Sequence, residues 1–334
     1  MSRFLRELPS TVRPEPAAVL LERGHSKHVL DGPRWRRTTR GFYVPKETES
    51  TPTQRIVEAA TVTPAEAVLG GWAAAFGHGV DLLDGLDDHT MRPVPITVFL
   101  PPRLHREPVA SLGYRQQVLD PDDVVSRRGL RFTRPVRTAL DLARWAPSVT
   151  EAVVALDTML QAKVVTRPTL ERRLSALWGQ RGVRQVAQAV SQGRVGVRSS
   201  WESRLRMLYV LELGFAVPVV NRSVFDRRGN FLGTPDLLDE EAGLVIEYDG
   251  ATWTGTPTPG GHRDPDQHRE DNAREERFER AGLLVVRADK GDLTRYRGRL
   301  RDRLRAARSD GLRRPRSRDR WTIDPPDHWY GMPA

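Results

Sequence analysis

The spacing of apolar residues predicts two kinds of periodic element in the C-terminal part of the chain. Trp201, Leu205 and Leu208 recur at helical spacing, whereas the apolar segments that follow are short and bounded by turn-like sequences. In chain order the pattern predicts a helix, three strands, a second helix and a last strand, over residues 199–209, 217–225, 234–238, 244–250, 266–281 and 283–287. Gly282 stands where glycine often ends a helix, which supports the last two boundaries.

The first 195 residues show a different succession of patterns, without an internal repeat. Periodicity predicts a short helix, a basic hairpin or wing, a buried alanine-rich helix, two strands and then a helical run, over residues 17–22, 35–45, 63–77, 94–100, 129–133 and from 137 onward. Within the run, 151–162 is amphipathic and Thr166 marks the start of the next helix. Residues 192–198 contain glycine and lack apolar periodicity, so we interpret them as a linker.

Two of the predicted C-terminal strands carry carboxylates within otherwise apolar segments. Glu247 and Asp249 lie two residues apart and therefore project from one face of their strand. A carboxylate on an apolar strand is costly unless it is paired or binds a metal. If the strands form a hairpin, Asp236 converges with the other two acids, and oxygen donors of this kind suit magnesium or manganese. A surface hairpin with solvated acids explains the same pattern without a site.

The order of these elements and acids resembles the PD-(D/E)XK nuclease fold, and more narrowly the proteins related to the very-short-patch-repair endonuclease. The matching positions, between about residues 199 and 295, are Glu202, Pro235, Asp236, Glu247, Tyr248, Asp249, Gly250, His268, Asp271, Arg274, Phe278 and 281–287. The resemblance implies an α/β restriction-endonuclease-like (αβββαβ) domain that hydrolyses DNA phosphodiester bonds with Mg²⁺ or Mn²⁺. It also implies catalytic roles for Glu202, Asp236, Glu247, His268, Asp271 and Arg274, and metal binding by Asp236, Glu247 and Asp249.

One position departs from the family pattern. The lysine that gives the family its name would stand at Asp249, and Lys290 is the only lysine in this part of the chain. Relatives of the very-short-patch-repair endonuclease accept aspartate there and rely on histidine, so His268 or His262 could handle the proton in this chain. A domain that binds DNA without cutting it is the alternative.

Each remaining site residue also has a purely structural explanation. Glu202 follows Ser199 by three residues, which is the capping-box pattern at the start of a helix. Asp271 and Arg274 stand at positions i and i+3, where they could form an ordinary ion pair on a helix surface. A histidine in a loop, such as His262, is more often solvated than catalytic.

The charge distribution points to a polyanionic partner. The chain carries a net charge of +10, and residues 295–320 alone hold twelve arginines against three aspartates. We expect a helix over 297–308 and a flexible basic segment beyond it, with arginine side chains suited to phosphate oxygens. An arginine-rich solvated surface is the alternative, because the whole chain holds 49 arginines and four lysines.

Part of the N-terminal region resembles the AbiEi-type antitoxins of type IV toxin–antitoxin systems. The matching segments are Arg37 with 40–45, the helix at 65–74, and 133–143. The resemblance implies a DNA-binding winged helix followed by a domain that acts in autoregulation or toxin neutralisation. Residues 1–34 are short for the helices of a winged helix, and an exposed hairpin explains the arginines of the wing equally well.

We therefore expect an α+β N-terminal region followed by an α/β nuclease-like domain. The expected divisions are an abbreviated winged-helix-like segment, an antitoxin-like region, a nuclease-like domain and a basic flexible tail, over residues 1–50, 51–195, 199–308 and 309–334.

Three functions stay open: a metal-dependent DNA endonuclease, an inactive DNA-binding regulator, and a protein-interaction module that neutralises a toxin. The chain has no cysteine, which excludes disulfides and cysteine-ligated metal sites. It lacks a signal-like N-terminus and any apolar stretch of about 20 residues, so we expect a cytoplasmic protein that does not insert into membranes. The sequence does not indicate the oligomeric state.

Overall fold

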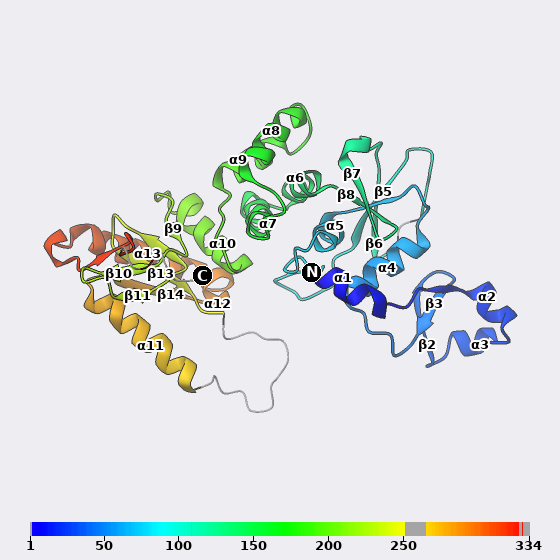
Figure 1. Cartoon of the computed structure of the whole chain (residues 1–334), viewed down its shortest axis with the longest axis horizontal. Coiled ribbons are helices and arrows are strands. Elements are labelled where there is room, and N and C mark those ends of the chain that lie inside the picture. The colour runs from blue at the N-terminus through cyan, green and yellow to red at the C-terminus, as the bar shows by residue number, and fades with distance from the viewer. Residues whose placement is uncertain (1, 108, 251–264, 327–328, 330–334) are drawn as a thin grey trace. The chain divides into compact units, whose positions relative to one another are not determined.

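The computed structural model describes residues 2–107, 109–250, 265–326 and 329, and of residues 265–269 and 271 it describes the backbone alone. The chain divides into two compact units, Met1–Gly193 and Arg194–Ala334 (Figure 1). Each unit has its own sheets and its own buried apolar side chains. In the described part of the chain, every helix is too short or too polar to cross a membrane.

The N-terminal unit opens with a small helix-and-wing arrangement. Its elements are α1 (Arg3–Glu7), β1 (Glu15–Pro16), α2 (Ala17–Glu22), α3 (Lys27–Leu30), β2 (Trp35–Thr39) and β3 (Phe42–Pro45). The strands form an antiparallel sheet in the order β1-β3-β2, and Gly41 has the positive φ of 78° that the tight turn between β2 and β3 requires. Leu20, Leu30 and Tyr43 form the core under this wing. The predicted short helix and basic hairpin are confirmed.

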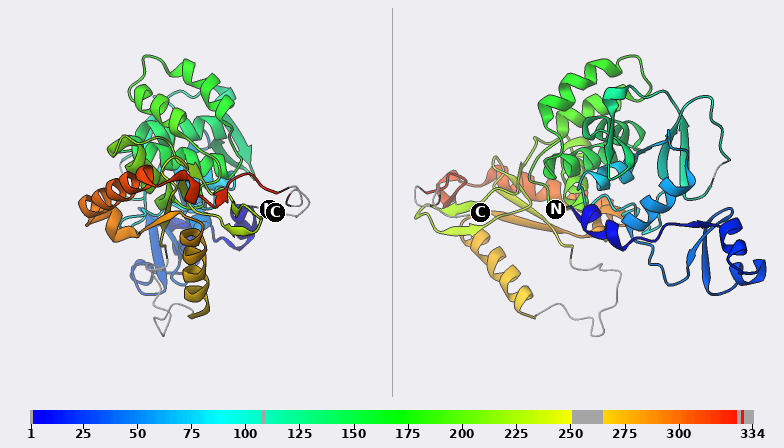
Figure 2. Two further views of the ribbon diagram at one scale, coloured as in Figure 1. Left: turned by 90° about the vertical axis from the view of Figure 1, so that its left-hand side faces the viewer. Right: turned by 45° about the vertical axis from the view of Figure 1, so that its right-hand side comes forward.

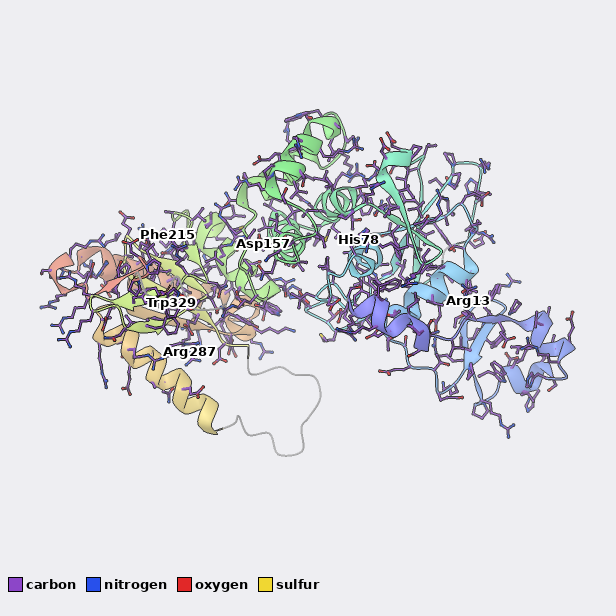
Figure 3. The ribbon with its side chains drawn as sticks, in the orientation of Figure 1. Arg13, His78, Asp157, Phe215, Arg287 and Trp329 are labelled. Atoms are coloured by element: carbon purple, nitrogen blue, oxygen red, sulfur yellow. The ribbon has the colours of Figure 1, made fainter. Side chains whose placement is uncertain are left out.

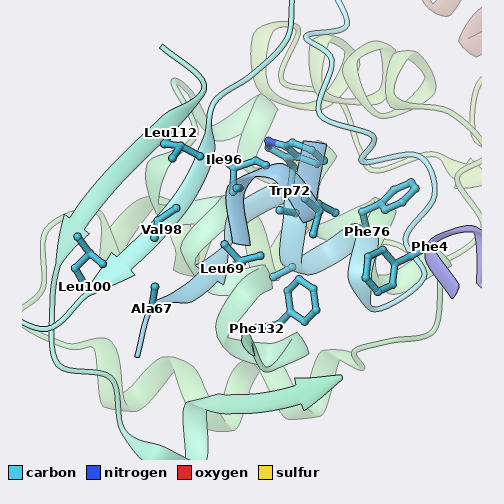
Figure 4. Close-up of a cluster of buried hydrophobic side chains, with 14 residues drawn as sticks. Phe4, Ala67, Leu69, Trp72, Phe76, Ile96, Val98, Leu100, Leu112 and Phe132 are labelled. Atoms are coloured by element: carbon cyan, nitrogen blue, oxygen red, sulfur yellow. The ribbon is translucent and has the colours of Figure 1, made fainter. Parts of the chain in front are cut away.

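A five-stranded mixed sheet and a group of helices complete the N-terminal unit (Figure 2). The elements are α4 (Pro52–Val62), β4 (Val68–Gly70), α5 (Gly71–Gly77), β5 (Ile96–Leu100), β6 (Leu112–Gln116), β7 (Val124–Arg127), β8 (Leu130–Thr133), α6 (Pro135–Trp145), α7 (Val149–Gln161), α8 (Arg167–Leu174) and α9 (Val183–Gln192). The strand order is β6-β5-β4-β8-β7. Phe4, Trp72, Phe76 and Phe132 pack together on this sheet with its aliphatic residues (Figure 4).

The single helix predicted over residues 63–77 is wrong in its first half. Val68–Gly70 form β4, the central strand of the sheet, which pairs with β5 on one side and β8 on the other. Burial between two strands outweighs the helical preference of the flanking alanines. Gly71, with a φ of 59°, then turns the chain directly from β4 into α5.

The C-terminal unit is built on a four-stranded sheet with helices packed against it. Its elements are α10 (Ser200–Met207), β9 (Val219–Val220), β10 (Val224–Asp226), β11 (Phe231–Gly233), β12 (Leu237–Asp239), β13 (Leu244–Tyr248), α11 (Pro265–Arg280), β14 (Leu284–Ala288), α12 (Lys290–Thr294), α13 (Arg297–Arg313) and β15 (Trp321–Thr322). The main sheet has the order β14-β13-β12-β9, with β13 and β14 parallel and the other pairs antiparallel. β11, β10 and β15 form a second, smaller sheet.

The strand predicted over residues 217–225 is in fact two strands in two different sheets. Asn221 lies between β9 and β10 with a φ of 45°, a left-handed conformation that interrupts an extended chain. The remaining predicted order, a helix before the strands and a helix before the last strand, agrees with the structure. The mixed α/β architecture is thus confirmed in its coarse form.

The basic segment predicted as flexible beyond residue 308 is folded against the C-terminal unit. α13 continues through Arg313, and the guanidinium of Arg314 pairs with Asp319 at 2.9 Å. β15 then pairs with β10. Polar contacts to carboxylates and backbone carbonyls hold this segment in place. Because it has no apolar stripe, the periodicity of the sequence did not indicate that it is folded.

A buried carboxylate joins α13 to the sheet. Asp239, at the end of β12, accepts hydrogen bonds from the Tyr209 hydroxyl at 2.5 Å, the Ala242 backbone N–H at 3.0 Å and the Arg308 guanidinium at 3.0 Å. The Arg308 guanidinium also lies over the ring of Phe215, 4.6 Å from its centroid. Burial, together with the hydrogen bond to Asp239, raises the pKa of the Tyr209 hydroxyl. One arginine of α13 thus compensates a charge that the sheet would otherwise bury alone.

Substitutions at two glycines of α13 test how closely this helix packs against the rest of the C-terminal unit. A Cβ atom at Gly311 would lie 2.1 Å from the backbone oxygen of Ala242, whereas a Cβ atom at Gly298 would meet no atom within 4 Å. We expect Gly311→Ala to destabilise the C-terminal unit by about 1–3 kcal/mol. Gly298→Ala should be neutral or stabilise it by up to about 1 kcal/mol, since alanine favours helices. Urea unfolding of the full chain measures both, and equal effects would contradict the close packing of α13.

Candidate functional site

Glu202 is buried near the start of α10, and one backbone N–H and one side-chain amide donate hydrogen bonds to its carboxylate. Ser199 accepts a hydrogen bond from the Glu202 backbone N–H at 3.2 Å, as an N-cap residue does. The Glu202 carboxylate does not complete a capping box. It accepts instead from the Arg198 backbone N–H and the Asn221 amide, each at 2.9 Å. Glu202 therefore ties the helix start to the turn between β9 and β10.

Asp236 and Glu247 come from neighbouring strands of the main sheet. Asp236 directly precedes β12, and its carboxylate accepts a hydrogen bond from the Tyr248 backbone N–H at 2.8 Å. Glu247 is buried on β13, and its carboxylate pairs with the guanidinium of Arg274 from α11 at 2.5 Å. Antiparallel pairing of β12 with β13 brings the two acids to the same end of the hairpin.

The electrostatics of Asp236 show that three carboxylates share this region. Desolvation is the largest cause that raises the pKa of Asp236 to about 7, and the negative charges of Glu202 and Glu247 raise it further. The Tyr248 hydrogen bond and the Arg274 charge act in the opposite direction. Like charges that perturb one another in this way are common at functional sites and also occur in structural networks.

Asp249 makes a different contact from the other acids. Its carboxylate lies 3.4 Å from the guanidinium of Arg287 on β14, which also reaches Glu275 of α11 at 3.4 Å. Its backbone N–H donates to the Ala288 carbonyl at 2.7 Å, which extends the parallel pairing of β13 with β14. Among the described contacts, Glu202, Asp236, Glu247 and Arg274 are thus brought together, and Asp249 belongs to an ion-pair group beside them.

Three residues predicted from the sequence cannot be placed at the site. The side chains of His268 and Asp271, which belong to α11, lie outside the described part of the structure, and so does all of His262. The alternative of a simple Asp271–Arg274 helix pair therefore stays a prediction, although Arg274 itself pairs with Glu247.

Two features of the site were not predicted. Asn221 bonds through its amide to Glu202 and to the Gly196 carbonyl at 2.8 Å, so an asparagine in a left-handed turn positions a buried acid. Trp201 stacks on Tyr248 with 6.0 Å between ring centroids, and the Lys290 ammonium lies 5.2 Å from the Trp201 ring. The only lysine of this unit thus lies over an aromatic ring next to the carboxylates.

The donor atoms suit a hard cation in kind, since carboxylate oxygens are what magnesium and manganese prefer. Within the described residues, however, no group of three or more histidine, aspartate or glutamate side chains is arranged to hold a metal ion. The Arg274 guanidinium supplies the positive charge at Glu247 instead. The cluster is therefore compensated by an arginine in this structure.

The wing of the N-terminal unit divides its arginines between two tasks. Arg36 points back to α4 and pairs with Glu58 at 2.7 Å, so it fastens the wing to the unit. Arg37 and Arg40 are exposed, and Arg40 precedes the Gly41 turn at the tip of the hairpin. The wing thus presents two cationic side chains to solvent.

Comparison with known proteins concerns mainly the N-terminal unit. Residues 66–191 match the family model of the AbiEi antitoxin C-terminal domain. No curated protein matches the chain.

A crystal structure of the RV2827C protein from Mycobacterium tuberculosis is similar over 66% of this chain and 86% of that chain, at 16% identity and a TM-score of 0.36. A TM-score of this size supports no conclusion about fold or function. The residues that match the AbiEi family model include β4–β8 and α5–α9. The central sheet and the helices of the N-terminal unit are therefore similar to an AbiEi antitoxin C-terminal domain.

Proposed function

We propose that this protein is an antitoxin-like regulator that neutralises a cognate toxin and binds DNA. The observation that carries the proposal is the match of residues 66–191 to the AbiEi antitoxin C-terminal domain. The matched segment is continuous in the chain from the central strand β4 to α9, and its sheet residues, among them Leu69, Val98 and Phe132, belong to one apolar core.

The segment before the match supports the regulatory part of the proposal. Two short helices, α2 and α3, are followed by the β2–β3 hairpin, whose Arg37 and Arg40 are exposed. Exposed arginines on a hairpin suit phosphate oxygens of a DNA backbone. The restricted length of α2 and α3, six and four residues, leaves the wing as the main contact surface.

Neutralisation can be tested in cells that express the cognate toxin of the same genome. We expect the full chain to restore growth, and Glu247→Gln to restore it equally well, because the matched segment lies in the other unit. Growth curves with and without induction of the chain measure the effect. Growth arrest that is the same with and without the wild-type chain would contradict the antitoxin proposal.

A second function is favoured by one specific observation, the position of Glu202 and Glu247 near the Asp236 carboxylate, whose pKa is about 7. We infer that these acids could support metal-dependent hydrolysis of DNA phosphodiester bonds. Asp236 and Glu247 would hold the magnesium or manganese ion, which when bound acidifies water and offsets charge on the phosphate. Arg274 lies next to both acids and can offset further negative charge there.

The remaining roles at this second site rest on the sequence. His268 is the residue that we propose as proton donor, with Asp271 on the same helix and Asp249 as a further ligand. The nuclease-like αβββαβ fold of the unit belongs to the same proposal, since its element order and its carboxylates support it.

Nicking of supercoiled plasmid separates the two functions. If the acids are catalytic, the wild-type chain nicks slowly with magnesium or manganese and not with a chelator. Glu247→Gln, which preserves the size of the buried side chain, should then reduce the rate at least a hundredfold. Glu240→Gln is the matched control, because Glu240 is exposed on the adjacent turn. Wild-type protein that never nicks with either metal, or nicking that survives Glu247→Gln, would exclude this site as the nuclease.

A further inference from the structure

A basic surface of the C-terminal unit is formed by residues other than those of the candidate site. A hollow of about 660 Å³ is open between the β10–β11 hairpin, the end of α11 and the segment before β15. Its charged lining consists of five arginines and one aspartate, namely Arg227, Arg228, Arg277, Arg280, Arg320 and Asp226. A concave surface with this excess of guanidinium groups suits an anionic partner.

The arginines at this hollow are available for a partner. Arg227, Arg228 and Arg320 are exposed, and none of them forms an ion pair with a described residue. Arg280 pairs with Glu276 at 2.8 Å, but the two side chains are 79% and 59% exposed, so the pair contributes little stability. Arg277 is fixed in place, since its Nε donates to the Leu232 carbonyl at 2.9 Å.

The one carboxylate at the hollow is already used within its own turn. Asp226 accepts hydrogen bonds from the backbone N–H groups of Arg228 and Asn230 at 2.8 and 2.9 Å, and from the Asn230 amide at 2.8 Å. The Asn230 hydrogen bonds lower the pKa of Asp226, so it stays ionised while it shapes the hairpin. The turn thereby holds Arg227 and Arg228 at the rim.

An exposed aromatic ring stands at the same rim. Phe231 is 43% exposed, although its ring stacks on Trp329 with 5.3 Å between centroids and an interplanar angle of 22°. Phe225, which is buried, contacts both rings, at 5.9 Å from Phe231 and 4.9 Å from Trp329 between centroids (Trp329 is labelled in Figure 3). An exposed aromatic side chain beside arginines is an arrangement with which proteins bind unpaired bases.

We infer that this hollow binds an unpaired segment of a nucleic-acid strand. The arginines contact successive phosphates, and a base stacks on Phe231. Aromatic stacking distinguishes this partner from an acidic peptide, which would use the guanidinium groups but gain little from the ring. Arg277 and Arg280 follow one another along α11 at about 4.5 Å of rise, which spaces two guanidinium groups along the strand. The inference does not depend on the antitoxin proposal.

Fluorescence anisotropy with a labelled 20-nucleotide oligothymidylate and a 20-base-pair duplex tests the inference on the full chain. Replacing Arg227, Arg228 and Arg320 together by alanine should weaken oligothymidylate binding at least tenfold. The slope of log affinity against log salt should become shallower by about two, because three phosphate contacts are lost. The control variant replaces Arg299, Arg305 and Arg313 of α13 by alanine. These arginines are exposed, and their replacement removes the same charge from the same unit.

A second variant tests the aromatic part. Phe231→Leu keeps an apolar side chain but removes the stacking face, so it should weaken oligothymidylate binding about tenfold and leave duplex binding nearly unchanged. Circular dichroism confirms that each variant is folded. Unchanged oligothymidylate binding by the triple variant, an equal loss in the control, or equal competition by polyglutamate would overturn the inference. Failure here leaves the growth assay for the antitoxin unaffected.

Discussion

Both units bury carboxylates, and arginine guanidinium groups make that burial tolerable. In the N-terminal unit, Arg137 pairs with Asp141 at 2.7 Å and with Asp123 at 3.1 Å. In the C-terminal unit, Arg308 pairs with the buried Asp239 at 3.0 Å. Removing one partner of such a pair leaves an uncompensated charge, which is strongly destabilising. The planar guanidinium can bond to two acceptors at once, so arginines such as Arg137 and Arg308 have a structural role in this arginine-rich chain.

The same constraint shapes the candidate site. Glu247 has the Arg274 guanidinium at 2.5 Å, whereas Asp236 relies on a backbone N–H and sits among like charges, which with desolvation raise its pKa to about 7. A regulator that only folds and binds DNA can keep this arrangement as it is. A nuclease would have to exchange part of the arginine compensation for a metal ion. The family match, which lies wholly in the other unit, favours the regulator.

Local patterns predicted the elements whose contacts are local. The helix at 17–22 and the basic hairpin are examples, and the two acid-bearing strands do pair as a hairpin. Patterns failed where distant contacts decide. Val68–Gly70 became a central strand because two other strands bury it. Residues 309–320 are folded because Arg314 and Arg316 reach backbone carbonyls far away in the sequence. Asn221 carried no periodic signal, since its role depends on a left-handed turn and one amide.

We propose that the chain is a DNA-binding regulator built around an antitoxin-like domain. The most direct test of this proposal is the affinity of the full chain for duplex DNA from upstream of its own gene, measured by anisotropy. The wild type is compared with Arg37→Ala/Arg40→Ala and with the control Arg103→Ala/Arg106→Ala, whose arginines are exposed elsewhere in the same unit. We expect the wing variant to lose at least tenfold in affinity, with a salt slope shallower by about two, while the control stays close to the wild type. Equal affinity of the wing variant and the wild type would contradict the claim.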